Sequence, residues 1–280
     1  MGWSELKHLS VTLEDDGKVA LLRLEHGKAN EMGIDEVDDF ARLARLLDDA
    51  DGPRTLITWS ERRSRKGTPI FISGANVSER QGWSTERVKE HVRWQRQVLA
   101  MLRQAPVFHV AVVNGVALGW GTEYLLTADY RLACDDARFG LPETNLGILP
   151  GAGGTSELWS HVGLAQALRL GMTGERIDAD EAWRIGLVQE RVGDVAAGVA
   201  RARELARLVG LRSPTAVAAF KRAVLASVGR PPSLRAEEEA RAYEHCVDTG
   251  EAAIGRSAFR KIVAGGSAPW GPRKPWSPLN

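Results

Sequence analysis

The sequence of residues 115–155 is GVALGWGTEYLLTADYRLACDDARFGLPETNLGILPGAGGT, and it holds two glycine-rich turns and two glutamates, Glu123 and Glu143. One turn, GVALGWG, precedes Glu123, and the other, GAGG, follows Glu143 after a few residues. Glycine lets the backbone adopt positive φ angles and lets a ligand approach it closely. Backbone N–H groups at the start of a following helix lack partners, so they can hold a phosphate or the oxyanion of a reacting carbonyl.

The glycines do not match a nucleotide-binding site. Neither turn has the GxGxxG spacing of a dinucleotide-binding turn, and GAGGTS lacks the lysine of a phosphate-binding loop. The chain also has no GxSxG elbow of a serine hydrolase and no CxxC or HExxH zinc motif. The turns therefore favour a carbonyl site, and we expect no metal.

The composition is that of an ordinary globular protein. The 280 residues carry 37 basic and 36 acidic side chains, a formal net charge of +1, which disfavours nucleic-acid binding. Two cysteines, and a polar start without the apolar core of a signal peptide, predict a cytoplasmic protein. No run approaches the ~18 apolar residues of a spanning helix, so we expect no membrane partner.

Apolar periodicity predicts an α/β core in the first two-thirds of the chain. The predicted helices cover 34–50 and 85–104, and the predicted strands cover 19–25, 54–60, 69–73, 107–113 and 129–135. Residues 195–264, rich in Ala, Arg, Glu and Leu, predict three or four helices without a strand. The tail holds several prolines and two tryptophans, and either docking on the surface or disorder fits it.

A second turn with an exposed donor follows the predicted strand at 69–73. In PIFISGANVSER the strand leads into Gly74 and Ala75, and a helix start follows. Two such donors would polarise one carbonyl oxygen from two sides. Glu123 and Glu143 could act as acid and base if an apolar pocket raised their pKa values. The alternatives are a helix-capping acid for Glu123 and a surface-loop acid for Glu143.

The segment from Asn114 to Thr155 resembles the central signature of the crotonase family, also called the enoyl-CoA hydratase/isomerase superfamily. The family has asparagine-glycine, a glycine triplet and a glutamate, then FGxPE and LGxxPGxGGT, and this chain has FGLPE and LGILPGAGGT. PIFISGAN resembles the family's other turn, LEHGKANEM its early coenzyme A loop, and MTGERIDADEAWRIGLVQERV the segment that closes its core. The resemblance covers about residues 11–265.

The resemblance implies a fold and an assembly. The family's ββα spiral core would occupy residues 1–193 and carry the acyl-CoA site. A helical C-terminal trimerisation region would occupy 194–264, followed by the Pro/Trp-rich tail at 265–280. The chains would assemble as homotrimers or as dimers of trimers.

The resemblance also implies the site. The backbone N–H groups of Ala75 and Trp120 would form an oxyanion hole for a thioester carbonyl, and Glu123 and Glu143 would be catalytic. The substrate is expected to be an acyl-CoA, with coenzyme A as part of the substrate and no separate cofactor. The implied substrate-binding positions are Lys28, Ala29, Gly74, Gly119 and Gly151.

Because both glutamates are present, the resemblance favours hydration of an α,β-unsaturated acyl-CoA. Glu123 would direct the attacking water to the β-carbon, and Glu143 would act as the acid/base at the α-carbon. The alternative is an isomerase, decarboxylase or hydrolase of an acyl-CoA or acyl-carrier-protein thioester on the same fold. One departure is Trp120, which stands where the family has the central glycine of its triplet. Its indole would either form a wall of the acyl pocket, which we favour, or pack away from it.

Overall fold

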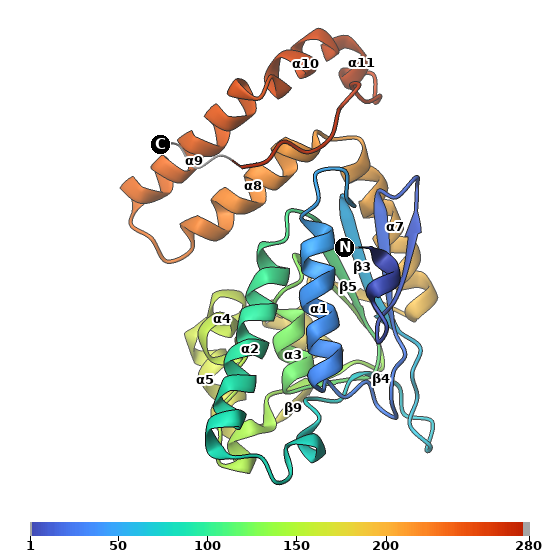
Figure 1. The fold of residues 1–280 in the computed structure, drawn as a ribbon, viewed down its shortest axis with the longest axis vertical. Helices are drawn as coiled ribbons and strands as arrows, with labels where there is room; N and C mark the ends of the chain where they lie inside the picture. The colour runs from blue at the N-terminus through green and yellow to red at the C-terminus, as the bar shows by residue number, and fades with distance from the viewer. Residues whose placement is uncertain (1, 277–280) are drawn as a thin grey trace.

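Two β-sheets organise residues 2–276, the part of the chain that the computed structural model describes (Figure 1). The larger sheet has the order β1-β2-β3-β5-β7-β10, and only the β1–β2 pair is antiparallel. Its strands are β1 (Ser10–Glu14), β2 (Val19–Leu24), β3 (Thr55–Ser60), β5 (Phe108–Val113), β7 (Tyr130–Cys134) and β10 (Glu190–Val192). The smaller sheet contains β4 (Ile70–Ile72), β6 (Val116–Leu118), β8 (Arg138–Gly140) and β9 (Arg176–Asp178), in that order.

Consecutive strands alternate between the two sheets. In the pairs β3–β4, β5–β6 and β7–β8, the first strand joins the larger sheet and the second joins the smaller one. A helix follows each pair: α2 (Thr85–Gln104), α3 (Trp120–Leu125) and α4 (Gly154–Val162). This repeated strand–strand–helix unit confirms the predicted ββα spiral.

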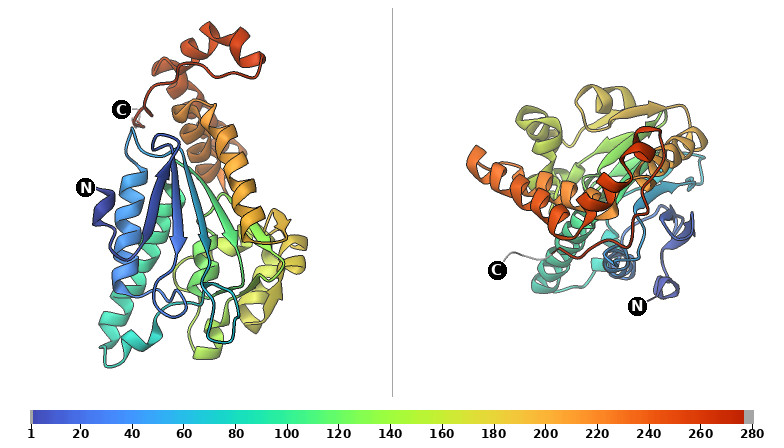
Figure 2. Two further views of the ribbon diagram at one scale, coloured as in Figure 1. Left: turned by 90° about the vertical axis from the view of Figure 1, so that its right-hand side faces the viewer. Right: turned by 90° about the horizontal axis from the view of Figure 1, so that it is seen from above.

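The larger sheet is covered on both faces, which explains its almost continuously apolar strands. Val110 and Val112 of β5 pack in a cluster with Val199 of α7 (Val195–Gly210). Ala111 and Val113, one position along, belong to the main core with α1 (Ile34–Leu47) and α3. Figure 2 shows α1 and α7 on opposite sides of the strands. Residues 107–113 were predicted to be such a strand.

Beyond β10 the described chain is helical, as predicted, although it contains more and shorter helices than expected. After α7 come α8 (Pro214–Ser227), α9 (Pro232–Asp248), α10 (Glu251–Ser257) and α11 (Phe259–Val263). Helices α8 to α11 project away from the two sheets (Figure 1). The other elements are α5 (Leu164–Thr173), α6 (Ala179–Arg184) and the 3-10 helices η1 (Trp3–Glu5), η2 (Val77–Arg80) and η3 (Pro142–Leu146).

Most predicted elements of the core are present with bounds close to those expected. Helix α2 has the predicted bounds, and α1 ends at Leu47 rather than at residue 50. The sequence did not predict β1, β6, β8, β9 or β10. No helix within residues 2–276 is both long enough and apolar enough to cross a membrane.

The tail docks on the body of the protein as far as residue 276. Arg273 is 6% exposed, and its guanidinium donates to the carbonyl oxygens of Leu47 (2.7 Å) and Pro106 (3.0 Å). Trp270 Nε1 donates to the carbonyl of Leu211 at 3.0 Å. The rest of the predicted tail, 277–280, lies outside the described residues.

We predict that Arg273→Met lowers the free energy of unfolding by about 2–3 kcal/mol, because buried carbonyl groups would lose a charged donor. Chemical denaturation measures this change. Lys274→Met is the matched control, since Lys274 is exposed and its contact to Thr215 comes from its backbone N–H. Equal unfolding midpoints for the two variants would show that Arg273 does not anchor the tail.

Candidate active site

Three parallel strands of the smaller sheet end at one edge. β4 pairs with β6 through Ile72 and Ala117, and β6 pairs with β8 through Leu118 and Gly140. Because neighbouring parallel strands end on the same side of a sheet, the residues that follow them meet there. These residues are Gly74 and Ala75 after β4, Gly119 and Trp120 after β6, and Glu143 after β8.

A cavity of about 720 Å³ lies at this edge, and α2 forms its opposite wall. It brings together seven of the nine residues predicted for the site: Gly74, Ala75, Gly119, Trp120, Glu123, Glu143 and Gly151. Lys28 and Ala29 do not line it, although they were predicted to bind substrate. The Lys28 side chain is exposed. The Ala29 carbonyl accepts a hydrogen bond from the backbone N–H of Ser73, so its loop adjoins the cavity wall without entering it.

The backbone N–H groups of Ala75 and Trp120 have no acceptor among the hydrogen bonds of the described residues. Ala75 forms a parallel bridge with Met32. That bridge uses the carbonyl of Gly74 and the N–H of Asn76, so the N–H of Ala75 points away from Met32. Trp120 is the first residue of α3, where an N–H has no partner within the helix. Both residues line the cavity.

Glu123 is buried in the first turn of α3 and is 3% exposed. Its Oε1 accepts hydrogen bonds from the backbone N–H groups of Ala152 (2.7 Å) and Gly154 (2.9 Å). Burial raises the pKa of Glu123, while these N–H donors and the positive charges of Arg96 and Arg80 oppose the rise. Neither hydrogen bond uses Oε2, which leaves that oxygen for a ligand in the cavity.

Burial also raises the pKa of Glu143, but the hydrogen bonds of Glu143 differ from those of Glu123. Its Oε2 is buried without a hydrogen-bond partner in the described structure. Burial, reinforced by the negative charge of Glu123, raises the pKa of Glu143 to about 7. Its Oε1 would lie 2.7 Å from a Cβ at Gly119, where φ is +53°. Position 119 therefore requires glycine, because a side chain would disfavour the positive φ angle and would collide with the carboxylate of Glu143.

The indole of Trp120 packs against aromatic side chains of the main core, and the residue also lines the cavity, so the expectation that the indole walls the acyl pocket stays a prediction. The residue is 2% exposed, and its ring stacks on Tyr124 with 5.8 Å between centroids. Phe40 of α1 lies 5.6 Å from the same ring. Packing among these aromatic rings removes most of the indole surface from water.

The chain is similar in sequence to proteins of known family. Residues 66–262 match the family model described as "Enoyl-CoA hydratase/isomerase". The chain belongs to this family. It is 32% identical over 258 residues to the short-chain-enoyl-CoA hydratase of Clostridium acetobutylicum, an alignment that covers 90% of this chain and 96% of the relative.

Solved structures of the family share the fold. An enoyl-CoA hydratase from Bacillus anthracis has a TM-score of 0.85 and 30% identity, covering 94% of this chain and 99% of that one. A putative enoyl-CoA hydratase from Streptomyces coelicolor has a TM-score of 0.85 and 29% identity, covering 98% and 97% of the two chains. They support the crotonase-like spiral described above.

The sequence analysis missed a group of cations in the cavity wall. They are Arg80 of η2 and three residues of α2: Lys89, Arg93 and Arg96. On α2 they recur every three or four positions, which places them on one helix face. That spacing was visible in the sequence, but the direction of the face was not. Residues 2–276 contain no group of three or more His, Cys, Asp or Glu side chains placed to hold a metal ion.

We predict that Glu143→Gln stabilises the fold at pH 8 by about 1–3 kcal/mol, because the substitution removes an unpaired, partly buried carboxylate. The pKa of Glu143 rises from an ordinary 4.5 to about 7 in the folded chain. The folded state therefore binds more protons between these values, and the parent loses stability as pH rises through this window. The gain in the variant should shrink towards pH 4.5.

Denaturation at several pH values measures the gain. Glu90→Gln, on the exposed side of α2, controls for the loss of one negative charge. A gain for Glu143→Gln that is the same at pH 5 and pH 8 would contradict the assignment.

Proposed function

We propose that the protein hydrates an α,β-unsaturated acyl-CoA. The observation that carries this proposal is the placement of Glu123, Glu143 and the two free N–H groups in one cavity. Family membership and the names of the relatives support it.

In the proposed mechanism the N–H groups of Ala75 and Trp120 hold the thioester oxygen. The water oxygen bonds to the β-carbon while Glu123 accepts a proton from the water, and the double-bond electrons move towards the thioester oxygen as an enolate. The enolate then takes a proton from Glu143 at the α-carbon, and the thioester carbonyl re-forms. Preorganised donors stabilise the enolate charge, each contributing on the order of 3 kcal/mol.

The two carboxyl environments suit these two roles. Glu123 must be ionised to accept a proton; burial raises its pKa, and its two N–H donors limit that rise. Glu143 must carry a proton, and its pKa of about 7 lets it do so near neutral pH. The substrate would bring coenzyme A itself, with the loop of Lys28 and Ala29 and the backbone at Gly74, Gly119 and Gly151 contacting it. No other cofactor takes part in this mechanism.

We predict that Glu143→Gln lowers turnover 10²–10⁴-fold with little change in thioester binding, because a proton donor is lost while the cavity keeps its shape. Glu123→Gln should abolish water addition while exchange of the α-proton with solvent survives through Glu143. Incubation with enoyl and carboxyacyl thioesters, followed by mass spectrometry, checks both variants and the reaction.

In that assay a gain of water supports hydration, whereas loss of carbon dioxide or of the thiol would select another enolate reaction. Glu90→Gln again serves as the control for charge. Parental rates of hydration in either active-site variant would reject its assigned role.

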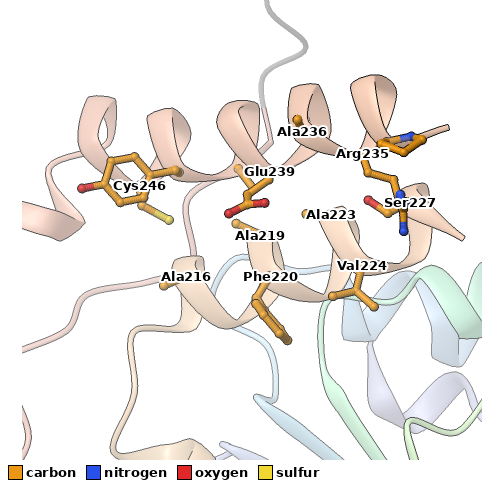
Figure 3. A pocket seen from close by; sticks show the side chains of 13 residues that line it. Ala216, Ala219, Phe220, Ala223, Val224, Ser227, Arg235, Ala236, Glu239 and Cys246 are labelled. Carbon is orange, nitrogen blue, oxygen red and sulfur yellow. The ribbon is translucent and has the colours of Figure 1, made fainter. Parts of the chain in front are cut away.

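We further propose that the chain assembles as a homotrimer or a dimer of trimers through the C-terminal helices. A cavity of about 780 Å³ lies between α8 and α9, lined largely by apolar side chains. Phe220 and Val224 of α8 are among the residues that line this cavity (Figure 3), and they are 71% and 49% exposed. Tyr243 and Phe259, farther along, are 73% and 64% exposed. So much exposed apolar area favours burial against another copy.

A second apolar surface lies on α4 to α6, and its exposed members are Trp159, Leu164, Leu168, Met172 and Trp183. Two different apolar surfaces on one chain suit a head-to-tail contact, which closes into a ring. The parent should therefore scatter light as three or six times its 30.5 kDa mass. Phe220→Asp should shift the mass towards the monomer, whereas Leu13→Asp, at an exposed apolar residue of β1, should not. A monomeric parent would contradict the proposal.

A further inference from the structure

Arg80 lines the active-site cavity without a carboxylate partner. It is the last residue of η2, five positions after the donor Ala75. Its guanidinium makes one hydrogen bond within the described residues, a long one of 3.4 Å to Gln95 Oε1, and makes no salt bridge there. Its Nε is buried and has no partner. A partly buried charge is normally paired with an opposite charge, because removing it from water is costly.

Neutral groups hold Arg80 in place. Gln95 of α2 is 3% exposed, and its Oε1 faces Arg80 while its Nε2 lies 3.0 Å from His91 Nε2. Burial, reinforced by the positive charge of Arg80, lowers the pKa of His91 to about 4, so His91 is neutral at pH 7. The chain from His91 through Gln95 orients the guanidinium without neutralising it.

Burial lowers the pKa of Arg80, and the negative charges of Glu79 and Glu123 oppose this effect, but neither acid forms a salt bridge with it in the described structure. Glu79 accepts from the backbone N–H of Ile34 at the start of α1. Glu123 is bonded to two backbone N–H groups, as described above. Glu86 pairs with Lys89 and Arg93, the two cations at the exposed end of this wall.

The cavity wall therefore has an excess of positive charge. Its ionisable residues are four cations, Arg80, Lys89, Arg93 and Arg96, and two acids, Glu123 and Glu143. Arg80 and Arg96 have no salt bridge in the described structure, although Arg96 Nε donates to the carbonyl of Gly151. The remaining lining includes apolar side chains, among them Val88, Val92, Leu118 and Ile148. This combination suits a ligand with an apolar chain and an anionic end.

We propose that the acyl chain of the substrate ends in a carboxylate, which the guanidinium of Arg80 binds. This inference rests on the proposed function, because it names the class of acyl group that the same site takes. The planar guanidinium can hold both oxygens of a carboxylate at once. The bond supplies the charge that Arg80 lacks in the free protein, and the apolar side chains contact the methylenes between the thioester and the carboxylate.

The phosphates of coenzyme A are the other anions that Arg80 could bind, and the choice of ligand separates the two. We would use saturated acyl thioesters of pantetheine, which have no phosphate and cannot be hydrated. One series of these ligands has acyl chains of increasing length that end in a carboxylate. Each member is compared with a ligand in which an uncharged isopropyl group of the same shape replaces the carboxylate. Calorimetry gives a Kd for each member.

For at least one chain length, the thioester that ends in a carboxylate should bind the protein at least tenfold more tightly than the neutral thioester of the same length. Arg80→Met should reduce this ratio of Kd values towards one, and Arg80→Lys should keep part of it. Arg93→Met removes a cation from the same wall that already pairs with Glu86, so it should change the ratio less. No preference for the carboxylate at any length, or an equal effect of the two arginine-to-methionine variants, would overturn the proposal.

The thermal midpoint of Arg80→Met provides an independent measurement. Replacing an unpaired, partly buried charge by an apolar side chain should leave the free protein at least as stable as the parent. A lower midpoint together with an unchanged Kd ratio would make Arg80 a structural residue and overturn the proposal. Because the ligands are unreactive, these results stand whether or not the protein hydrates enoyl thioesters, which the mass-spectrometric assay decides separately.

Discussion

The parallel pairing of β4, β6 and β8 is the constraint on which the site depends. These strands have three residues each, so few backbone bonds fix their register. Buried Thr122 adds to them: its hydroxyl lies 2.8 Å from the carbonyl of Ala117 in β6 and 3.0 Å from that of Gly140 in β8. The start of α3 is thereby tied to the ends of two strands. A shift of one strand would separate the donors at Ala75 and Trp120 and remove the site while leaving the larger sheet intact.

The fold treats its two active-site carboxylates unequally. Glu123 receives two backbone N–H groups, one from Ala152 in the turn before α4 and one from Gly154, the first residue of α4. Glu143 receives no such compensation at Oε2, and burial, reinforced by the negative charge of Glu123, raises its pKa to about 7. Since one group must accept a proton and the other must release one, this difference in environment sets their roles in the proposed mechanism.

The sequence predicted those parts of the site that depend on local chemistry. Glycine-rich turns marked the donors at Ala75 and Trp120, and apolar periodicity placed α2 at its observed bounds. β6 and β8 were not predicted, because three residues are too few to show a period, whereas β4 was predicted from the apolar run PIFIS. The direction of the Trp120 indole depends on Phe40 and Tyr124, which meet it only in the folded core. Arg80 was missed for a similar reason, since its lack of a counter-ion is visible only once its neighbours are placed.

Catalysis and recognition of the acyl chain therefore depend on different elements. The proposed oxyanion donors are backbone groups, so a tryptophan at position 120, where the resemblance implies a glycine, still provides an N–H. The cations of the cavity wall lie on η2 and α2. Arg96 donates to the carbonyl of Gly151, and the others make no hydrogen bond within residues 2–276 to the turns that hold the proposed donors or Glu123. Substitutions at Arg80 can change which acyl group binds while the strand edge stays in register. The same edge can thus serve different thioesters, because enolate stabilisation requires only the carbonyl that every such substrate has.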